Sequence, residues 1–240
     1  MPRFPVRKSQ IKNGQAIISG SDYRHIVKVL RLKVGHEIIL FDESGTEHSA
    51  TITEIAKNEV KLAIAESRKV ETESSLNIVL LQVVPKGNKM DFIIEKATEL
   101  GVKTIVPVIA DRSQIRKTGK IERWRKVAKE SSKQCGRTAQ PDIYTLKNFR
   151  EVIKLYNHSA LRMILDNQCK DDIKYVITSV PQSPTNITLL VGPEGGFSNA
   201  EIRLAKENGF IPTGLGPRTF RTETASIVAI TILQYIYGDI

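Results

Sequence analysis

The sequence contains few residues that bind metals, with two cysteines and four histidines among 240 residues. Cys135 and Cys169 form no CxxC pair and have no histidines clustered beside them. This spacing predicts neither a zinc site nor a disulfide framework. We therefore expect a protein that needs no metal, and the unpaired cysteines favour a reducing cytoplasm.

The sequence also lacks a long hydrophobic run. Its longest apolar stretch, 225–237, is interrupted by Ser226, Thr231 and Gln234. This stretch is shorter than the roughly 18 residues that a membrane span requires, so it predicts a buried helix. The basic residues 1–10 are not followed by the apolar segment of a signal peptide. We expect a cytoplasmic protein with no membrane partner.

Two common nucleotide-binding motifs are incomplete. Residues 85–89 (PKGNK) lack the glycine and Ser/Thr spacing of a Walker A loop. Gly214 and Gly216 begin a turn similar to GxGxxG, but Thr219 stands at the last glycine position and no βαβ unit follows. Phosphoryl transfer and dinucleotide binding are therefore disfavoured.

Positive charge is abundant and lies mainly in two regions. The chain has 36 Lys and Arg against 26 Asp and Glu, a net charge of +10. Residues 1–35 hold eight basic residues against one acid, and residues 112–137 hold ten against two. Two such regions indicate surfaces that meet a polyanion such as RNA, although solvated helix faces are the alternative. The residues favoured for RNA contact are Arg3, Arg7, Arg24, Lys28, Arg31, Arg123 and Lys126.

One aromatic residue lies inside the second basic region. Trp124 is flanked by Arg123 and Arg125, an arrangement that would allow it to stack on a base. Packing in a core is the more frequent role of a tryptophan on a helix. We therefore predict packing and keep stacking as the alternative.

The first third of the chain has the pattern of a small, mostly β domain. Residues 21–30 place apolar side chains at i, i+3, i+4 and i+7, which predicts an amphipathic helix. Alternating runs predict strands at 36–41, 46–55 and 59–66. The polar stretch 67–75 (SRKVETESS) follows them and favours a domain boundary there.

The rest of the chain alternates between strand and helix patterns. Apolar runs predict strands at 76–84, 104–110, 161–166 and 187–191. Helical periodicity predicts helices at 88–100, 121–135 and 225–237. A capping box at Ser198 and Glu201 begins a further helix that ends at Gly209. This alternation is typical of an α/β domain with a largely parallel sheet.

Two glycine-rich turns follow the later strands. The first is LVGPEGGF at 190–197, and the second is GLGPR at 214–218, which leads into RTETA at 221–225. Ligands of α/β sheets bind at the carboxyl ends of the strands. Glycine there lets a ligand approach the backbone closely. Both turns are therefore candidate ligand-binding loops, with simple turn geometry as the alternative.

Several ordered motifs together resemble the RsmE family, SPOUT-class methyltransferases that modify N3 of a uridine in 16S ribosomal RNA. The resemblance covers nearly the whole chain. In the first domain it is carried by MPRF at 1–4 and HIVKVLRLKVG at 25–35. In the second it is carried by KGNKMD at 86–91, EKATELG at 95–101, Arg112 with Ser113, Gln134 with Arg137, GPEGG at 192–196 and RTETA at 221–225.

The resemblance implies a PUA-like RNA-binding β-barrel domain over 1–72 and an α/β SPOUT methyltransferase domain with a trefoil knot over 73–240. General topology rules would argue against a knot. The resemblance also implies a homodimer, the cofactor S-adenosyl-L-methionine, and 16S ribosomal RNA or the small ribosomal subunit as partner. The cofactor-binding residues that it implies are Leu190, Gly192, Pro193, Glu194, Gly195, Gly196, Leu215, Gly216, Phe220, Arg221 and Thr224.

The implied reaction places its own demands on the site. Uridine N3 must lose a proton before it attacks the methyl donor, and the resulting negative charge would be stabilised by a nearby cation. Glu223 could orient an arginine or accept the proton, although an ion pair between Arg221 and Glu223 is the structural alternative. The candidate catalytic residues are Arg221, Glu223, Arg112 and Arg137.

Two other functions remain compatible with the sequence. One is a SPOUT methyltransferase that acts on another RNA, because the cofactor site specifies the methyl donor and not the base. The other is a non-catalytic RNA-binding or ribosome-assembly module, which the two basic regions would also serve. The glycine-rich turns favour an enzyme over the second alternative.

Overall fold

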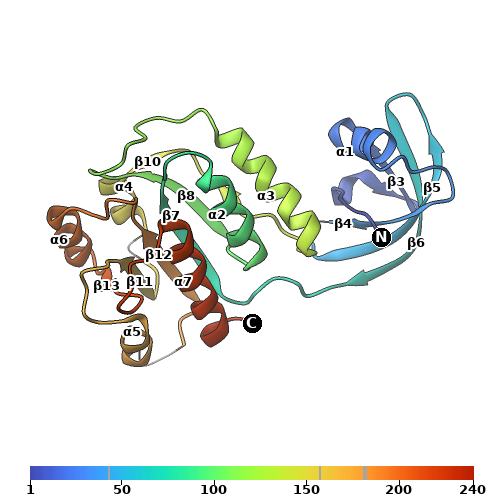
Figure 1. Cartoon of the computed structure of the whole chain (residues 1–240). Coiled ribbons are helices and arrows are strands. Elements are labelled where there is room, and N and C mark those ends of the chain that lie inside the picture. Colours follow the sequence, from blue (N-terminus) through green and yellow to red (C-terminus); the bar gives the residue numbers. More distant parts are fainter. Residues whose placement is uncertain (43, 157, 181–182) are drawn as a thin grey trace. The chain divides into compact units, whose positions relative to one another are not determined.

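The computed structural model of the chain describes residues 1–42, 44–156, 158–180 and 183–240 (Figure 1). These residues form two compact units. The small unit comprises residues 1–73 and 132–139, and the large unit comprises residues 74–131 and 140–240. Helix α3 (Ile121–Cys135) therefore begins in the large unit and ends in the small unit. The sequence patterns did not indicate this return of the chain.

A six-stranded sheet forms most of the small unit. Its strands lie in the order β1 (Arg3–Pro5), β4 (Glu37–Phe41), β5 (Thr46–Ile55), β6 (Glu59–Lys69), β3 (Gln15–Ser19) and β2 (Ile11–Lys12). β1 is parallel to β4, and the other neighbours are antiparallel. The three predicted strands are confirmed as β4, β5 and β6. Their alternating side chains, such as Ile38, Ile52 and Leu62, fill one core.

The predicted helix at 21–30 is less regular than its apolar spacing indicated. After the 3-10 turn η1 (Lys8–Gln10), α1 (Gly20–Arg24) continues into η2 (His25–Val29), a π-helical turn. There the Leu30 N–H donates to the His25 carbonyl oxygen at 2.9 Å. The wider turn moves the side chains off the 3.6-residue period. Ile26 is therefore fully buried while Leu30 is 39% exposed, and the predicted stripe is wrong at its last position.

The large unit is built on a parallel sheet of seven strands. They lie in the order β10 (Lys147–Asn148), β8 (Thr104–Ile109), β7 (Asn77–Val83), β12 (Asn186–Val191), β11 (Leu161–Leu165) and β13 (Ile211–Thr213), with β9 (Asp142–Ile143) also beside β8. Consecutive residues of a strand face opposite sides of the sheet, and Leu189 and Leu190 are both fully buried. The continuous apolar runs predicted this burial on both faces.

Helices cover both faces of this sheet. One core contains residues of α2 (Lys89–Glu99), α3, α5 (Ile173–Ser179) and α7 (Thr222–Tyr237), and the other contains residues of α4 (Phe149–Leu155) and α6 (Asn199–Glu207). The sequence did not predict α4 and α5, because seven residues are too few for a clear helical period. None of the described helices combines the length and the apolar character of a membrane span.

Trp124 of α3 belongs to the first of these cores. It is 1% exposed, and its Nε1–H donates to Asp91 Oδ1 at 3.1 Å. Packing, the role predicted for this residue, is therefore confirmed. Its ring has no free face on which a base could stack.

The segment after β13 lies against the segment after β11. β13 lies at the edge of the sheet next to β11, whereas α7 packs against α2 and β12 (Figure 1). The Gly214 N–H donates to Asp171 O at 2.8 Å, and the Gly214 carbonyl accepts the Ile173 N–H at 2.9 Å. The segment after β13 is thus bonded to the segment after β11. The trefoil knot that the resemblance implies stays a prediction for this part of the chain.

Buried cations attach the segment 132–139 to the rest of the small unit. Lys133 Nζ lies 2.6 Å from Asp22 Oδ1, and Arg137 Nη2 lies 2.7 Å from Glu73 Oε2. The other oxygen of Glu73 accepts two backbone N–H groups of 132–139, at 3.1 and 3.0 Å. Lys133 and Arg137 are only 7% and 4% exposed. Part of the second basic region therefore has a structural role.

We predict that Arg137→Met destabilises the small unit by roughly 2–4 kcal/mol. Removing one partner of a buried ion pair leaves the other without its counter-charge, and the partial exposure of Glu73 moderates the cost. Urea unfolding followed by circular dichroism measures the change. The matched control is Lys57→Met, which removes a cation from an exposed position of the same unit. Equal unfolding midpoints for Arg137→Met and the control would contradict this role.

Candidate active site

A cavity of about 280 Å³ lies at the carboxyl ends of β11, β12 and β13, beside the start of α7. Its walls come from the loops that follow these three strands and from the first turn of the helix. This is the place where α/β sheets commonly bind ligands. The three loops lie together because β12, β11 and β13 are neighbouring parallel strands of the sheet.

Most of the predicted cofactor residues line this cavity. They are Gly192, Pro193, Glu194, Gly196, Leu215, Gly216, Phe220 and Arg221. Three others do not line it. Leu190 is fully buried within β12, Thr224 is exposed on α7, and Gly195 lines a neighbouring groove. Contact of these three with a cofactor stays a prediction.

The cavity is also lined by residues that the sequence patterns did not indicate. Leu165, Asp166 and Asn167 come from the end of β11 and the loop after it, and Thr213, Thr222 and Ala225 come from β13 and α7. The sequence could have indicated Leu165, Asp166 and Asn167, because it predicts the end of a buried strand at 166 and ligands bind at such strand ends. No sequence pattern could have indicated that β13 lines the cavity, because three residues are too few for a strand pattern.

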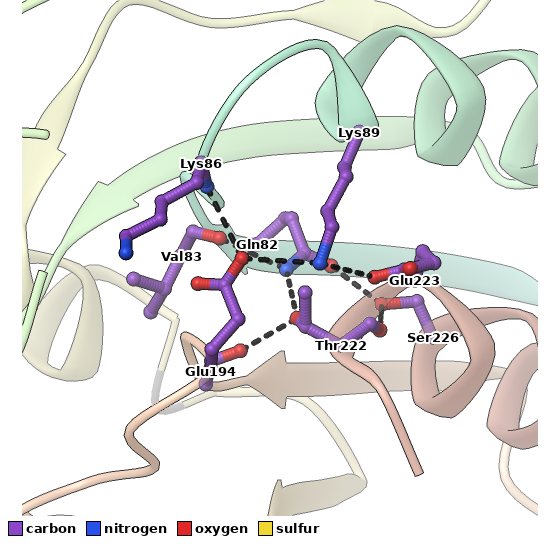
Figure 2. Close-up of polar contacts among 9 residues, drawn as sticks. Gln82, Val83, Lys86, Lys89, Glu194, Thr222, Glu223 and Ser226 are labelled. Carbon is purple, nitrogen blue, oxygen red and sulfur yellow. Dashed lines mark hydrogen bonds and ion pairs between the residues drawn. The ribbon is translucent and has the colours of Figure 1, made fainter. Parts of the chain in front are cut away.

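A chain of buried hydrogen bonds fixes the start of α7 against the sheet (Figure 2). Gln82 of β7 donates from Nε2 to Thr222 Oγ1 at 3.1 Å, and its Oε1 accepts from Ser226 Oγ at 2.5 Å. Thr222 Oγ1 in turn donates to the Gly192 carbonyl oxygen at 2.6 Å. Gln82 and Ser226 are fully buried, and Thr222 is 5% exposed. One side chain of the sheet thus positions both the helix and the first glycine-rich loop.

Lys89 joins the two acidic residues beside the cavity. Figure 2 shows its ammonium group between Glu194 and Glu223, with Nζ at 3.3 Å from an oxygen of each. Partial burial opposes the charge of Lys89, but the two carboxylates outweigh it and raise the pKa of the lysine. Burial likewise opposes the charge of Glu194, but hydrogen bonds from backbone N–H groups and from Lys89 lower the pKa of that carboxyl. Lys89 and Glu194 therefore stay charged at neutral pH.

This ion pair corrects one structural alternative. The sequence allowed an ion pair between Arg221 and Glu223, but the partner of Glu223 is Lys89. Arg221 precedes the first turn of α7 and is exposed at the cavity. Within the described residues its guanidinium forms no ion pair, so it is available to a ligand.

The other two catalytic candidates lie outside the cavity lining. Arg112 follows β8, and its Nη1 donates to the Gly195 carbonyl oxygen at 2.8 Å, which supports the first glycine-rich loop from outside. Arg137 belongs to the small unit and is bound to Glu73. Catalytic roles for both stay predictions, and the structure gives Arg137 a structural partner.

The residues predicted to contact RNA fall into two groups. The first group, Arg7, Arg24, Lys28, Arg31 and Lys126, is exposed.

Two other arginines of that set have protein partners. Arg3 forms an ion pair with Glu47 and donates to Gly136 O at 3.0 Å. Arg123 is ion-paired with Asp91, although its side chain remains 57% exposed. The exposed residues therefore remain the better candidates for a phosphate contact.

Comparisons with known proteins agree with this architecture. Family models match residues 72–234, described as an RNA methyltransferase domain, and residues 18–65, described as an RNA methyltransferase PUA domain. The ribosomal RNA small subunit methyltransferase E of Buchnera aphidicola is 33% identical over 244 residues, covering 100% of this chain and 95% of that protein.

Two solved structures are similar over almost their whole length. A methyltransferase of Legionella pneumophila in complex with its cofactor SAM has a TM-score of 0.91 and 32% identity, covering 99% of this chain and 98% of that one. The ribosomal RNA small subunit methyltransferase E of Neisseria gonorrhoeae bound to S-adenosyl methionine has a TM-score of 0.90 and 32% identity, covering 100% and 99%.

We predict that Gln82→Met lowers the free energy of unfolding by about 1–3 kcal/mol. The side chains are similar in size, but methionine removes the buried amide that donates to Thr222 Oγ1 and accepts from Ser226 Oγ. The measurement is urea denaturation monitored by circular dichroism. Gln114→Met, at an exposed position of the same unit, serves as the control. If both variants unfold like the parent chain, the hydrogen-bond chain does not stabilise the site.

Proposed function

This chain belongs to the ribosomal RNA small subunit methyltransferase E family, and we propose that it methylates N3 of a uridine in 16S ribosomal RNA with S-adenosyl-L-methionine as the methyl donor. The observation that carries the proposal is the cavity formed by the three loops and α7, in a chain that matches SAM-bound relatives over its full length.

The cavity residues suit this cofactor. The cavity volume of about 280 Å³ is near the lower limit for small-molecule sites. Leu165, Leu215 and Phe220 offer apolar surface to a flat purine ring, while Asp166 and Asn167 offer polar groups to ribose hydroxyls. A bound S-adenosylmethionine supplies a methyl group on a positively charged sulfur. Methyl transfer then depends mainly on the alignment of base and donor in one site.

Arg221 is suited to stabilise the anion of the base. Deprotonated uridine carries negative charge on the carbonyl oxygens beside N3, and Arg221 presents a cation at the cavity. The N-terminal N–H groups of α7 add positive potential at the same place. A fixed cation of this kind lowers the energy of a charged transition state. Glu223 as the proton acceptor stays a prediction, because its carboxylate is paired with Lys89.

The small unit supports contact with the RNA outside the cavity. The part of it that matches an RNA methyltransferase PUA model, residues 18–65, contains the exposed cations Arg24, Lys28 and Arg31. Exposed cations exchange counterions for phosphates, which makes binding dependent on salt. We infer that this surface holds 16S ribosomal RNA within the small ribosomal subunit. The cytoplasm follows as the location, because ribosomal RNA is there.

A homodimer is part of the proposal. Phe92 on α2, and Tyr235 and Ile236 on α7, are 46%, 74% and 45% exposed. The two helices pack against each other, so these side chains belong to neighbouring elements. Exposed apolar groups of this size favour a protein contact. A second copy of the chain would bury them.

The two alternative functions differ from the proposal in different ways. A non-catalytic RNA-binding module has no use for a site made from three loops, and membership of the family argues against it. A methyltransferase for another RNA would keep the same cavity and differ in the RNA that it binds. Mapping of modified nucleotides in ribosomal RNA from cells with and without the gene separates that alternative from the proposal.

We predict that Gly216→Val weakens binding of S-adenosylmethionine at least tenfold, about 1.4 kcal/mol. Gly216 lines the cavity with φ at +96°, a conformation that a branched residue adopts only with strain. Isothermal titration calorimetry gives the affinity. Gly119→Val is the matched control, because a Cβ there meets open space and φ is ordinary. Parental affinity in Gly216→Val would remove this loop from the cofactor site.

We also predict that Arg221→Ala reduces the single-turnover methylation rate by about 10²–10³-fold at saturating cofactor and RNA, the typical effect of losing one positioned donor. The melting temperature should stay unchanged, because the side chain is exposed. Arg150→Ala, at an exposed position on α4, is the control. Near-normal turnover in Arg221→Ala would refute the catalytic role, and equal losses of stability and cofactor affinity would indicate a structural one.

A further inference from the structure

A second groove adjoins the cofactor cavity in the large unit. It has a volume of about 410 Å³ and shares five lining residues with the cavity: Asp166, Asn167, Glu194, Gly196 and Phe197. The two spaces therefore meet along the loops after β11 and β12. From there the groove extends to α6, which contributes Asn199, Ile202, Arg203 and Lys206.

The part of the groove away from the cavity is rich in positive charge. Arg203 and Lys206 are three residues apart on α6, so they lie on the same face of the helix. Both are exposed, and neither forms an ion pair with any described residue. Arg112, from the loop after β8, also lines the groove, and its Nη1 donates to the Gly195 carbonyl oxygen at 2.8 Å.

The acidic groups of the groove do not cancel these cations. Glu194 is already bonded to Lys89 Nζ and to the Lys86 N–H, each at 3.3 Å. Asp166 accepts the Gln168 N–H at 3.0 Å within its own loop. The groove therefore has three cations, and of its two carboxylates only that of Asp166 has no cation beside it among the described residues. Such a groove attracts an anion that can reach from the methyl-transfer site towards α6.

We propose that this groove binds the sugar-phosphate backbone of the RNA strand next to the methylated base, with Arg203 and Lys206 as the phosphate contacts. The inference rests on the proposed function, since it takes the neighbouring cavity as the site of methyl transfer. A base that enters the cavity carries its flanking phosphates with it, and the groove is the adjoining space with unpaired cations. Phosphate contacts fix the position of a strand without reading its sequence.

The experiment compares Arg203→Ala/Lys206→Ala with the parent chain in three measurements on the full-length protein. RNA affinity is measured by fluorescence anisotropy, with an unmodified small-subunit ribosomal RNA transcript over a series of KCl concentrations. Cofactor affinity is measured by calorimetry. The single-turnover rate is measured at saturating RNA. The matched control, Lys154→Ala/Lys174→Ala, removes the same charge from exposed positions on α4 and α5 that line neither space.

We expect the Arg203/Lys206 variant to bind RNA at least tenfold more weakly. The slope of log K against log salt should become shallower by roughly 1.4, which is two phosphate contacts at about 0.7 each. Cofactor affinity should stay within about twofold of the parent value, because neither residue lines the cofactor cavity. Arg203→Lys/Lys206→Arg should restore RNA affinity, because a phosphate contact depends on charge. The control variant should behave like the parent chain.

Two outcomes would overturn the proposal. If RNA affinity and salt slope equal those of the parent chain, the groove binds no phosphate. If cofactor affinity falls together with RNA affinity, the groove holds part of the cofactor instead. Failure of the proposed function is distinguishable from both, because it would appear as no methyl transfer by the parent chain whatever the groove variant binds.

Discussion

The functional half of the molecule depends on one buried glutamine. Gln82 lies in a central strand and satisfies both Thr222 and Ser226, and Thr222 then holds the Gly192 carbonyl. Because these side chains are buried, each of the polar groups would be costly without a partner. The bonds therefore allow one arrangement of α7 and the first glycine-rich loop. The cavity wall at Gly192 and Thr222, and Arg221 beside it, take their positions from this arrangement.

Positive charge in this chain divides into structural and available groups. Arg3, Lys133 and Arg137 have partners within the small unit, and burial makes those contacts hard to exchange for a phosphate. Arg24 and Lys206, in contrast, are exposed. Counting charges along the sequence places Arg3, Arg24, Lys133 and Arg137 in the basic regions with one polyanion-binding role, and it does not single out Lys206. Burial separates them, because a desolvated cation is retained only where a protein acid faces it.

Much of the fold was predictable because local patterns carry it. Alternation gave β4, β5 and β6, continuous apolar runs gave the central parallel strands, and the capping box at Ser198 gave the start of α6. The helices α4 and α5 were missed because seven residues make less than two full turns, which is too short for a periodic pattern. The π-helical turn at 25–29 was missed because periodicity assumes a regular helix.

The sequence by itself determined the two glycine-rich loops, the α/β class and the family resemblance, because each depends on residue types at short, fixed spacings. Only the tertiary structure decided which side chains meet. It paired Glu223 with Lys89 instead of Arg221, placed Asp166 beside the loops of β12 and β13, and gave Arg137 to Glu73. Glu223 and Lys89 are 134 positions apart and Arg137 and Glu73 are 64 positions apart, so no local pattern records these contacts. Their contacts exist because the strand order of the sheet and the return of the chain to α7 bring distant segments together.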